Sequence, residues 1–150
     1  MEVPRSLRSW FVVHGALGVA AALPLLVAPG LILRRLGWTA VDPVTARLVG
    51  AALLAIGAAS TSARDAGIDV TRALLRLNLV WSLAAACALF AGIGAGAPPA
   101  AWAFLSIFIA FAGVWLHHAI RFRQLERAAT LDDSPENDDS EHAPPDSASD

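Results

Sequence analysis

Residues 100–120 read AAWAFLSIFIAFAGVWLHHAI, a stretch without any Asp, Glu, Lys or Arg. A helix needs about 20 such residues to cross the roughly 30 Å hydrocarbon core of a bilayer. Three earlier apolar blocks have a similar length, over residues 10–33, 44–63 and 73–93, and the last two contain one arginine each, Arg47 and Arg76. Soluble core helices could imitate one such block, but four of them in 150 residues would leave no polar surface. The sequence therefore predicts an all-α integral membrane protein, an antiparallel four-helix bundle.

The composition agrees with this prediction. The chain is 56% hydrophobic and its mean hydropathy is +0.55, whereas a soluble domain is about 45–50% apolar. Its one cysteine, Cys87, lies inside the third block, which excludes a disulfide framework and a cysteine metal site. No metal site is predicted and no residue pattern indicates catalysis, so we do not expect an enzyme.

Proline and capping signals mark the ends of the blocks. Asp42 followed by Pro43 is typical of an N-cap and the first helical position, so the second helix should begin there. Pro24 should kink or end the first helix, which leaves residues 29–38 as a short interfacial segment. Residues 92–99, rich in glycine and proline, predict a tight loop before the fourth helix.

Tryptophans are expected at the membrane boundaries, where an aromatic belt forms. Four of the five occupy such positions in this sequence. They are Trp10, Trp38, Trp102 and Trp115. Trp81 lies near the middle of the third block instead.

The first block shares one feature with a secretory signal peptide, because Arg5 and Arg8 precede it. Its apolar stretch is longer than the usual core of about 7–15 residues, and no clean cleavage site closes it. We therefore expect a retained helix.

The arginines predict the orientation. Eight lie on the side of the N-terminus, the second loop and the C-terminus; the other side has only Arg34, Arg35 and Arg47. Cytoplasmic loops carry the excess of basic residues, so both termini should be cytoplasmic in a multi-pass protein of the cell membrane. Residues 1–125 form the predicted transmembrane domain. Residues 126–150 are predicted to be a disordered acidic cytoplasmic tail, either a solvating segment or a docking segment for a partner.

Cation and proton transport are disfavoured by the predicted spans, none of which contains Asp or Glu. Such transporters place a carboxylate at membrane depth to bind and release the charge. A small four-helix multidrug antiporter would have a Glu in its first helix, where this chain has His14. Arg47 and Arg76, near span ends, should extend toward lipid phosphates.

Small residues at four-residue spacing predict faces for close helix packing. One stripe lies in the second block and one in the third. They comprise Ala51, Ala55 and Ala59, and Ala84, Ala88 and Gly92. Asn78 and Ser82 form an i, i+4 polar pair that should hold helices together by hydrogen bonds.

The histidines are the candidate site residues. His14 shares a helix face with two small residues of the first block, and His117 ends a small, partly polar face of the fourth, formed by Ser106, Ala110 and Gly113. Both should lie roughly 6 Å inside the cytoplasmic boundary at 1.5 Å per residue. Because the first and fourth helices of such a bundle are neighbours, His14 and His117 are predicted to face each other. His118 should point about 100° away, toward the interface.

Two interpretations of the pair remain open. The histidines are either interfacial residues satisfied by headgroups, water or backbone, or a shared site for an anionic headgroup, a quinone or a bis-histidine haem. The sequence alone does not identify a cofactor.

Three stretches resemble the small four-helix membrane proteins grouped as DoxX-like: residues 34–38 (RRLGW), Asp42-Pro43, and residues 47–57 (RLVGAALLAIG). The resemblance implies a four-helix membrane fold over roughly residues 10–120, and some members of that group are linked to quinone-dependent oxidation. We expect a structural or accessory component of a membrane assembly, or alternatively a redox or quinone-associated subunit using His14 and His117. The expected partners are the lipid bilayer and a membrane protein or second copy, not nucleic acid.

Overall fold

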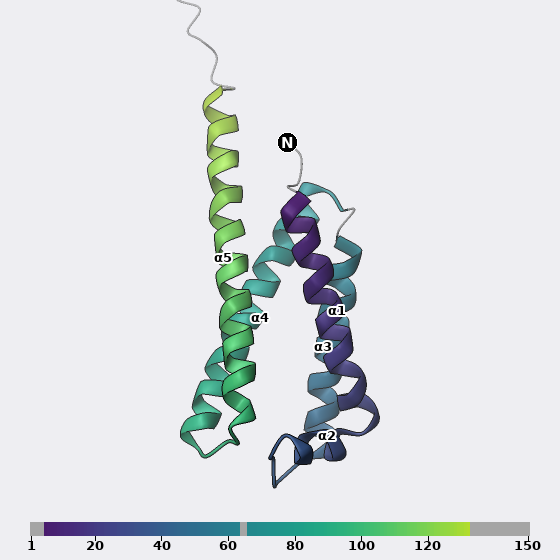
Figure 1. Cartoon of the computed structure of the whole chain (residues 1–150). Coiled ribbons are helices and arrows are strands. Elements are labelled where there is room, and N and C mark those ends of the chain that lie inside the picture. The colour runs from purple at the N-terminus through teal and green to yellow at the C-terminus, as the bar shows by residue number, and fades with distance from the viewer. Residues whose placement is uncertain (1–4, 64–65, 133–150) are drawn as a thin grey trace, which may run out of the picture. The chain divides into compact units, whose positions relative to one another are not determined.

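The computed structural model describes residues 5–63 and 66–132, and within them every regular element is a helix (Figure 1). The five helices are α1 (Arg5–Val27), α2 (Pro29–Arg35), α3 (Pro43–Ser62), α4 (Ile68–Gly94) and α5 (Ala100–Asp132). The predicted all-α class is confirmed.

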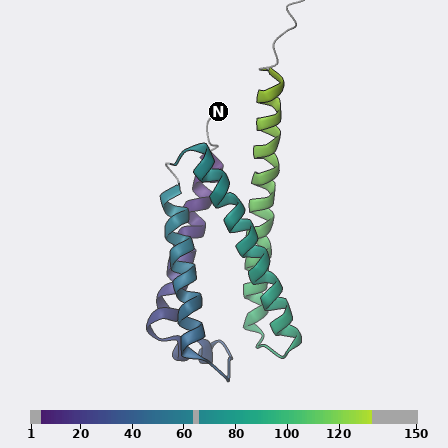
Figure 2. The same cartoon turned by 180° about the vertical axis from the view of Figure 1, so that it is seen from behind.

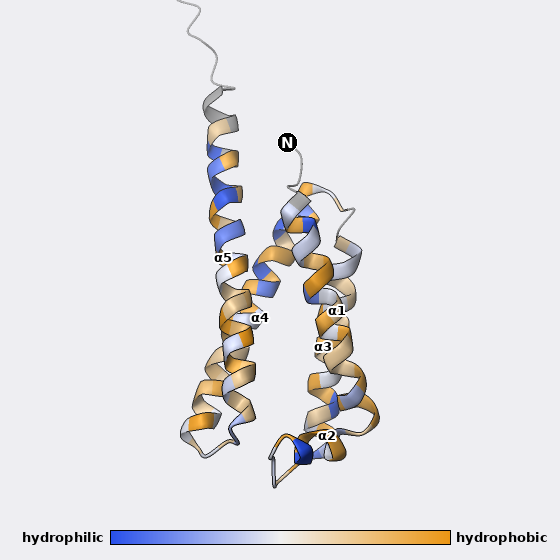
Figure 3. Cartoon of the chain, in the orientation of Figure 1, coloured by the Kyte–Doolittle hydropathy of each residue, from blue (hydrophilic) through white to orange (hydrophobic). Residues whose placement is uncertain are grey.

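Four of these helices are long and apolar enough to cross a membrane. The candidate spans are Ser6–Val27, Pro43–Ser62, Ile68–Gly94 and Ala100–Leu125. Figure 3 shows hydrophobic residues along all four, with hydrophilic residues at α2, on the first half of α4 and on the part of α5 beyond its apolar stretch. The chain is therefore a multi-pass membrane protein with four spans.

The chain divides into two compact units, Met1–Ala119 and Ile120–Asp150. In the second unit α5 continues to Asp132, so the first seven residues of the segment predicted as a tail, 126–132, are helical. The rest of the tail prediction lies outside the described residues.

Proline acts differently at two positions of the first block. Pro24 lies inside α1, which continues to Val27, so of the two predicted effects, a kink or an end of the helix, the end does not occur. The break comes at Pro29, the first residue of the short helix α2. Proline suits a first helical position because the N–H that it lacks would have no intrahelical partner there.

The start of α3 confirms the predicted cap. The Asp42 carboxylate accepts hydrogen bonds from the backbone N–H of Val44 at 3.0 Å and of Thr45 at 3.1 Å, and from the Thr45 hydroxyl. These bonds favour the charged carboxylate, and the Thr45 hydroxyl contributes most to holding the pKa of Asp42 below its ordinary value. Pro43 follows at the first helical position.

Glycines allow α1 and α3 to lie in direct backbone contact (Figure 2). A Cβ atom added to Gly57 would lie 2.9 Å from the carbonyl oxygen of Gly15 and 3.3 Å from the amide nitrogen of Val19. One added to Gly18 would lie 3.2 Å from the carbonyl oxygen of Leu53. In lipid such close approach supplies the dispersion contacts that hold helices together.

The packing faces are not the predicted alanine stripes. In α3 the buried residues are Ala46, Gly50, Gly57 and Ser60, while Ala51 and Ala55 are exposed. In α4 they are Thr71, Leu75, Asn78 and Ser82, while Ala84 and Ala88 are exposed. These four alanines therefore do not pack against the rest of the described chain, and only the last member of each stripe, Ala59 or Gly92, is half-buried.

The apolar core joins α1, α4 and α5. It consists of Leu7, Phe11, Leu75 and Trp115, all nearly or fully inaccessible. The Phe11 and Trp115 rings stack with centroids 5.3 Å apart. Trp115 was predicted to be an interfacial belt residue, which is wrong, because it is the largest fully buried side chain.

Two loops meet at one end of the first unit. A Cβ on Gly37, after α2, would lie 2.9 Å from Pro98, which precedes α5. Trp38 and Phe104 lie nearby, with ring centroids 6.2 Å apart. The start of α1, the end of α3 and the start of α4 lie at the opposite end (Figure 1). This alternation is the antiparallel order expected of four successive spans.

Candidate functional site

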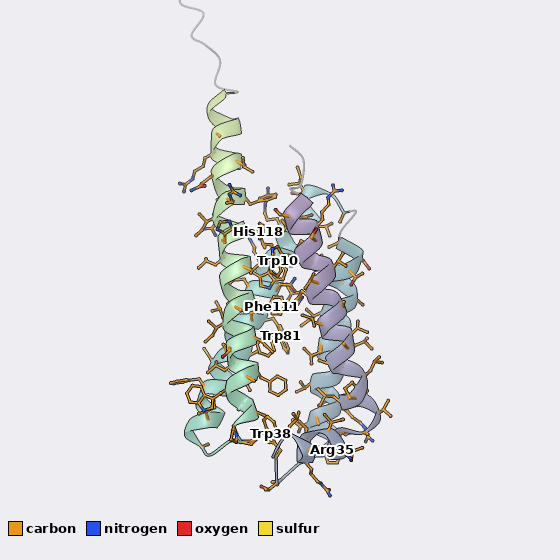
Figure 4. All side chains as sticks on the ribbon, viewed as in Figure 1. Trp10, Arg35, Trp38, Trp81, Phe111 and His118 are labelled. Atoms are coloured by element: carbon orange, nitrogen blue, oxygen red, sulfur yellow. The ribbon has the colours of Figure 1, made fainter. Side chains whose placement is uncertain are left out.

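His14 lies on the buried face of α1, in register with Leu7 and Phe11 at i, i+4 and i+7 spacing. It is only 8% exposed. Its ring meets two rings of α5 edge to face, Phe111 at a centroid distance of 4.8 Å and Trp115 at 5.3 Å. Phe111 is labelled in Figure 4 on the side of α5 that faces α1. These two aromatic rings thus flank the imidazole and orient it.

Hydrogen bonds extend this contact to α3 and α4. The Asn78 side-chain amide donates to the Ser60 hydroxyl oxygen at 3.1 Å. That oxygen lies 3.5 Å from Nδ1 of His14 and 3.4 Å from the Asn78 amide oxygen. Because Ser60 and Asn78 are fully buried, these neutral side chains satisfy one another where water is scarce. We call His14, Ser60, Asn78, Phe111 and Trp115 the His14 cluster.

The serine hydroxyl can serve the imidazole in two ways. If Ser60 donates to Nδ1 of His14, the imidazole carries its proton on Nε2 and offers a donor there. If Ser60 donates to the Asn78 amide oxygen instead, Nδ1 of His14 carries the proton and donates to Ser60. In both arrangements the amide of Asn78 remains a donor to Ser60, so α3 and α4 stay joined. The predicted role of Asn78 in holding helices together is confirmed.

Several buried polar atoms have no hydrogen-bond partner in the part of the chain that the structure describes. They are Trp115 Nε1, Ser82 Oγ, Thr71 Oγ1 and Trp81 Nε1. Ser82 and Thr71 are on the same face of α4 as Asn78, one turn after it and two turns before it. Both residues of the predicted pair, Asn78 and Ser82, are therefore buried. Of these two, only Asn78 forms a side-chain hydrogen bond to another helix among the described residues.

The predicted pairing of His14 with His117 is wrong. His117 is exposed, whereas His118 is only 8% exposed. The buried positions of α5 in the first unit follow a different face from the one predicted: they are Ala101, Leu105, Ala112, Trp115 and His118. Trp115 sets this face, because burying so large a ring turns His118, three residues later, to the same side.

This geometry does not provide the predicted bis-histidine haem site. Such ligation requires two imidazoles directed at one iron, and His117 does not share the interior with His14. Among the described residues, no three His, Cys, Asp or Glu side chains are grouped as metal ligands would be. A role for either histidine in binding some other ligand stays a prediction.

Two arginines occupy a shallow hollow on α2, far along the chain from His14. Arg34 and Arg35 line it with Gly30 and Leu31. Arg47 was predicted to extend toward lipid phosphates, but its Nε donates to the carbonyl oxygen of Leu26 at 3.3 Å. A cation at this position also interacts favourably with the C-terminal end of α1.

Ser60, Trp115 and His118 were not recognised as core residues from the sequence. For Ser60 a signal was present, because Gly50, Gly57 and Ser60 share one helix face. The chain matches no known family model, no curated protein and no solved structure.

Proposed function

We propose that this membrane protein is a structural or accessory component of a larger membrane assembly. The observation that carries the proposal is the outward face of α4, where Ala84, Cys87, Ala88 and Ala91 are all exposed. These residues follow helical spacing and form a smooth strip, which we call the α4 strip. Small residues of this kind let a second transmembrane helix approach closely.

A close contact between helices through small residues already exists inside the chain. The backbones of α1 and α3 come together at Gly15, Gly18 and Gly57 because no side chain separates them. The α4 strip also consists of small residues, here alanines and a cysteine, and all of them are exposed among the described residues. A helix of another protein, or of a second copy, would supply the dispersion contacts that α4 lacks there.

The polar groups of the spans fit a role in packing better than one in ion transport. The cluster residues His14, Ser60 and Asn78 bond to one another. Asp69 lies in the first turn of α4, where its carboxylate pairs with Arg72 at 3.3 Å and is largely solvent-exposed. A carboxylate at the end of a span does not provide a mid-membrane ion site.

The finer parts of the proposal concern place and orientation. We propose that the protein resides in the cell membrane with both termini cytoplasmic, because the arginines on that side outnumber the others by eight to three. We also propose a relationship to the DoxX-like proteins. The resembling residues lie at the end of α2, in the loop that follows it and within α3, and they include the cap at Asp42.

Cys87 offers a direct test, since it is the chain's single cysteine and is exposed within the α4 strip. A photoreactive maleimide attached to Cys87 in native membranes should crosslink to one defined partner. Ala88→Leu places a bulky side chain in the strip and should abolish the crosslink. Ala110→Leu, a matched change at an exposed alanine of α5, should leave it intact.

Mass spectrometry of the adduct would identify the partner or a second copy. An adduct that contains only lipid would contradict the proposal, as would a protein adduct that persists equally in both leucine variants. Purification in a mild detergent should recover the same partner with the unmodified protein.

A further inference from the structure

The end of the first unit that contains α2 has positive charge without an acidic counterpart. Arg34 and Arg35 are exposed, and they line the shallow hollow on α2 together with Gly30 and Leu31. Neither guanidinium forms an ion pair among the described residues. Asp42, the acidic residue nearest to them in the sequence, uses its carboxylate for the cap of α3. The hollow, which we call the α2 hollow, therefore offers two cations to an anion from outside the chain.

The short helix α2 holds these two side chains on a fixed backbone. Its first residue, Pro29, is buried. Just beyond its other end Gly37 has a φ of 98°, which glycine adopts without strain because it has no Cβ. The Gly37 N–H donates to the Arg34 carbonyl at 3.0 Å and the Trp38 N–H donates to the Leu33 carbonyl at 3.0 Å, the two bonds of a Schellman motif. A ligand that binds there does not have to order the backbone first.

The helix α2 lies at the depth expected for lipid headgroups. The span before it, Ser6–Val27, has 22 residues, which correspond to about 33 Å at 1.5 Å per residue, against roughly 30 Å for the hydrocarbon core. Since α2 begins at Pro29, its arginines lie just beyond that core. Arg35 and Trp38 are both labelled at this end in Figure 4, and tryptophan is typical of the membrane interface.

We propose that the α2 hollow binds the phosphate group of an anionic phospholipid, with Arg34 and Arg35 donating to its oxygens. A guanidinium stays charged and presents a planar set of N–H donors that matches phosphate oxygens. Leu31 lines the same hollow and is 58% exposed, so it offers apolar surface to the start of an acyl chain. This site goes beyond the accessory role, and it depends on neither the α4 strip nor the orientation of the chain.

Charge and apolar surface favour this ligand over two related ones. A zwitterionic phospholipid has its own cation, which the two arginines would repel and which no carboxylate among the lining residues would attract. A free phosphate ion would use the arginines but not Leu31, and salt would screen its attraction to so exposed a site. The acyl chains of a lipid remain in the bilayer, so they keep its headgroup at a high effective concentration beside α2.

The test uses the full chain in a mild detergent and measures lipid binding by native mass spectrometry. The probes are dioleoyl phosphatidylglycerol, which is anionic, and dioleoyl phosphatidylcholine, which is zwitterionic. The first phosphatidylglycerol should bind at least about tenfold more tightly than phosphatidylcholine, because only the former adds net charge attraction to the hydrogen bonds.

Arg34→Gln and Arg47→Gln form a matched pair, because each removes one positive charge at the same end of the chain. Arg34 lines the hollow, whereas the Nε of Arg47 donates to the carbonyl oxygen of Leu26. Arg34→Gln should weaken phosphatidylglycerol binding about tenfold, since it removes charge-assisted hydrogen bonds to the phosphate. Arg47→Gln should change that affinity by no more than about twofold.

Gly30→Leu distinguishes a shaped site from general surface charge, because it changes no charge. A Cβ built on Gly30 would lie 3.9 Å from Nη2 of Arg34, an ordinary contact, so Gly30→Ala should bind phosphatidylglycerol as the parent does. A leucine side chain would extend farther and occupy part of the hollow that Gly30 lines. Gly30→Leu should therefore weaken phosphatidylglycerol binding about tenfold, whereas an attraction to net charge alone would not change.

Four results would overturn the proposal. Equal affinity of the parent for the two lipids would show that the hollow does not select an anionic headgroup. Equal weakening in Arg34→Gln and Arg47→Gln would assign the preference to the net charge of this end. Unchanged affinity in Gly30→Leu would show that the hollow does not hold the headgroup. Displacement of phosphatidylglycerol by equimolar glycerol phosphate, which has no acyl chains, would make this a site for a soluble anion and not for a lipid.

Discussion

Replacing Gly15 with alanine tests the contact between α1 and α3. A Cβ at this position would lie 2.7 Å from the carbonyl oxygen of Gly57 and 3.3 Å from the amide nitrogen of Thr61, and it would clash with the Thr61 hydroxyl. The hydroxyl can rotate away, but the carbonyl of Gly57 belongs to the helix backbone. The two helices must therefore separate or tilt to accept the methyl group.

The size of the effect follows from two opposing terms. Alanine is better than glycine in a helix interior by about 1 kcal/mol, whereas overpacking a tight contact costs about 1–3 kcal/mol. Gly113→Ala in α5 carries only the first term, because nothing lies within 4 Å of a Cβ built there. The difference between Gly15→Ala and Gly113→Ala, about 1–3 kcal/mol, therefore isolates the overpacking.

Unfolding in mixed micelles, with increasing SDS and helix content followed by circular dichroism, measures both variants against the parent. Gly113→Ala should be at least as stable as the parent, and Gly15→Ala should be the least stable of the three. If Gly15→Ala matches Gly113→Ala, the close approach of α1 and α3 does not exist in the membrane protein, and the packing argument fails with it.

Asp42→Ala should lower the melting temperature more than Asp42→Asn, because asparagine also caps helices well. In the parent, the contribution of this cap should be present above the unfolded-state pKa and be lost as the pH falls through the lowered folded-state pKa of Asp42; melts at graded pH would show no such loss if the cap does not form. Asn78→Leu should lower the free energy of unfolding by about 1 kcal/mol in the SDS titration, since it removes the interhelical hydrogen bond. His118→Ala should lower the melting temperature, whereas His117→Ala should change the free energy of unfolding by no more than about 0.5 kcal/mol. The reverse order would mean that His117, and not His118, lies on the buried face of α5. In a chain whose native cysteine is replaced, Ala95→Cys should react with an impermeant maleimide on intact cells, and labelling only after lysis would invert the orientation.

The spans could be predicted because they depend on length and hydropathy alone. The second predicted block, 44–63, differs from α3 by one residue at each end, and the Asp42 cap supplied its start. The third block began five residues late, because Ile68–Arg72 contains polar residues that still form the first turn of α4. The fourth began correctly at Ala100, but α5 runs past the apolar stretch, since nothing in a helix requires it to end where the membrane does.

The rotation of each helix could not be predicted in the same way. A soluble helix buries its apolar side and shows its polar side, so its pattern reveals the core. In lipid the outer face is also apolar, and that contrast disappears. Alanine packs equally well against lipid and against protein. For this reason the spacing of Ala51 and Ala84 predicted packing faces at positions that are exposed.

Polar side chains are the better guide to rotation, because a hydroxyl or amide that faces hydrocarbon loses its hydrogen bonds. On α4 the polar residues Thr71, Asn78 and Ser82 all lie on the buried face, so they would have given its rotation correctly. On α5 the guide fails for a physical reason. The hydroxyl of Ser106 donates to the carbonyl oxygen of Trp102 at 2.9 Å, so it is satisfied by its own helix and can remain exposed. A serine that is hydrogen-bonded within its own helix therefore does not indicate which helix face is buried. The predicted face of α5, through Ser106 and His117, depends on such a serine.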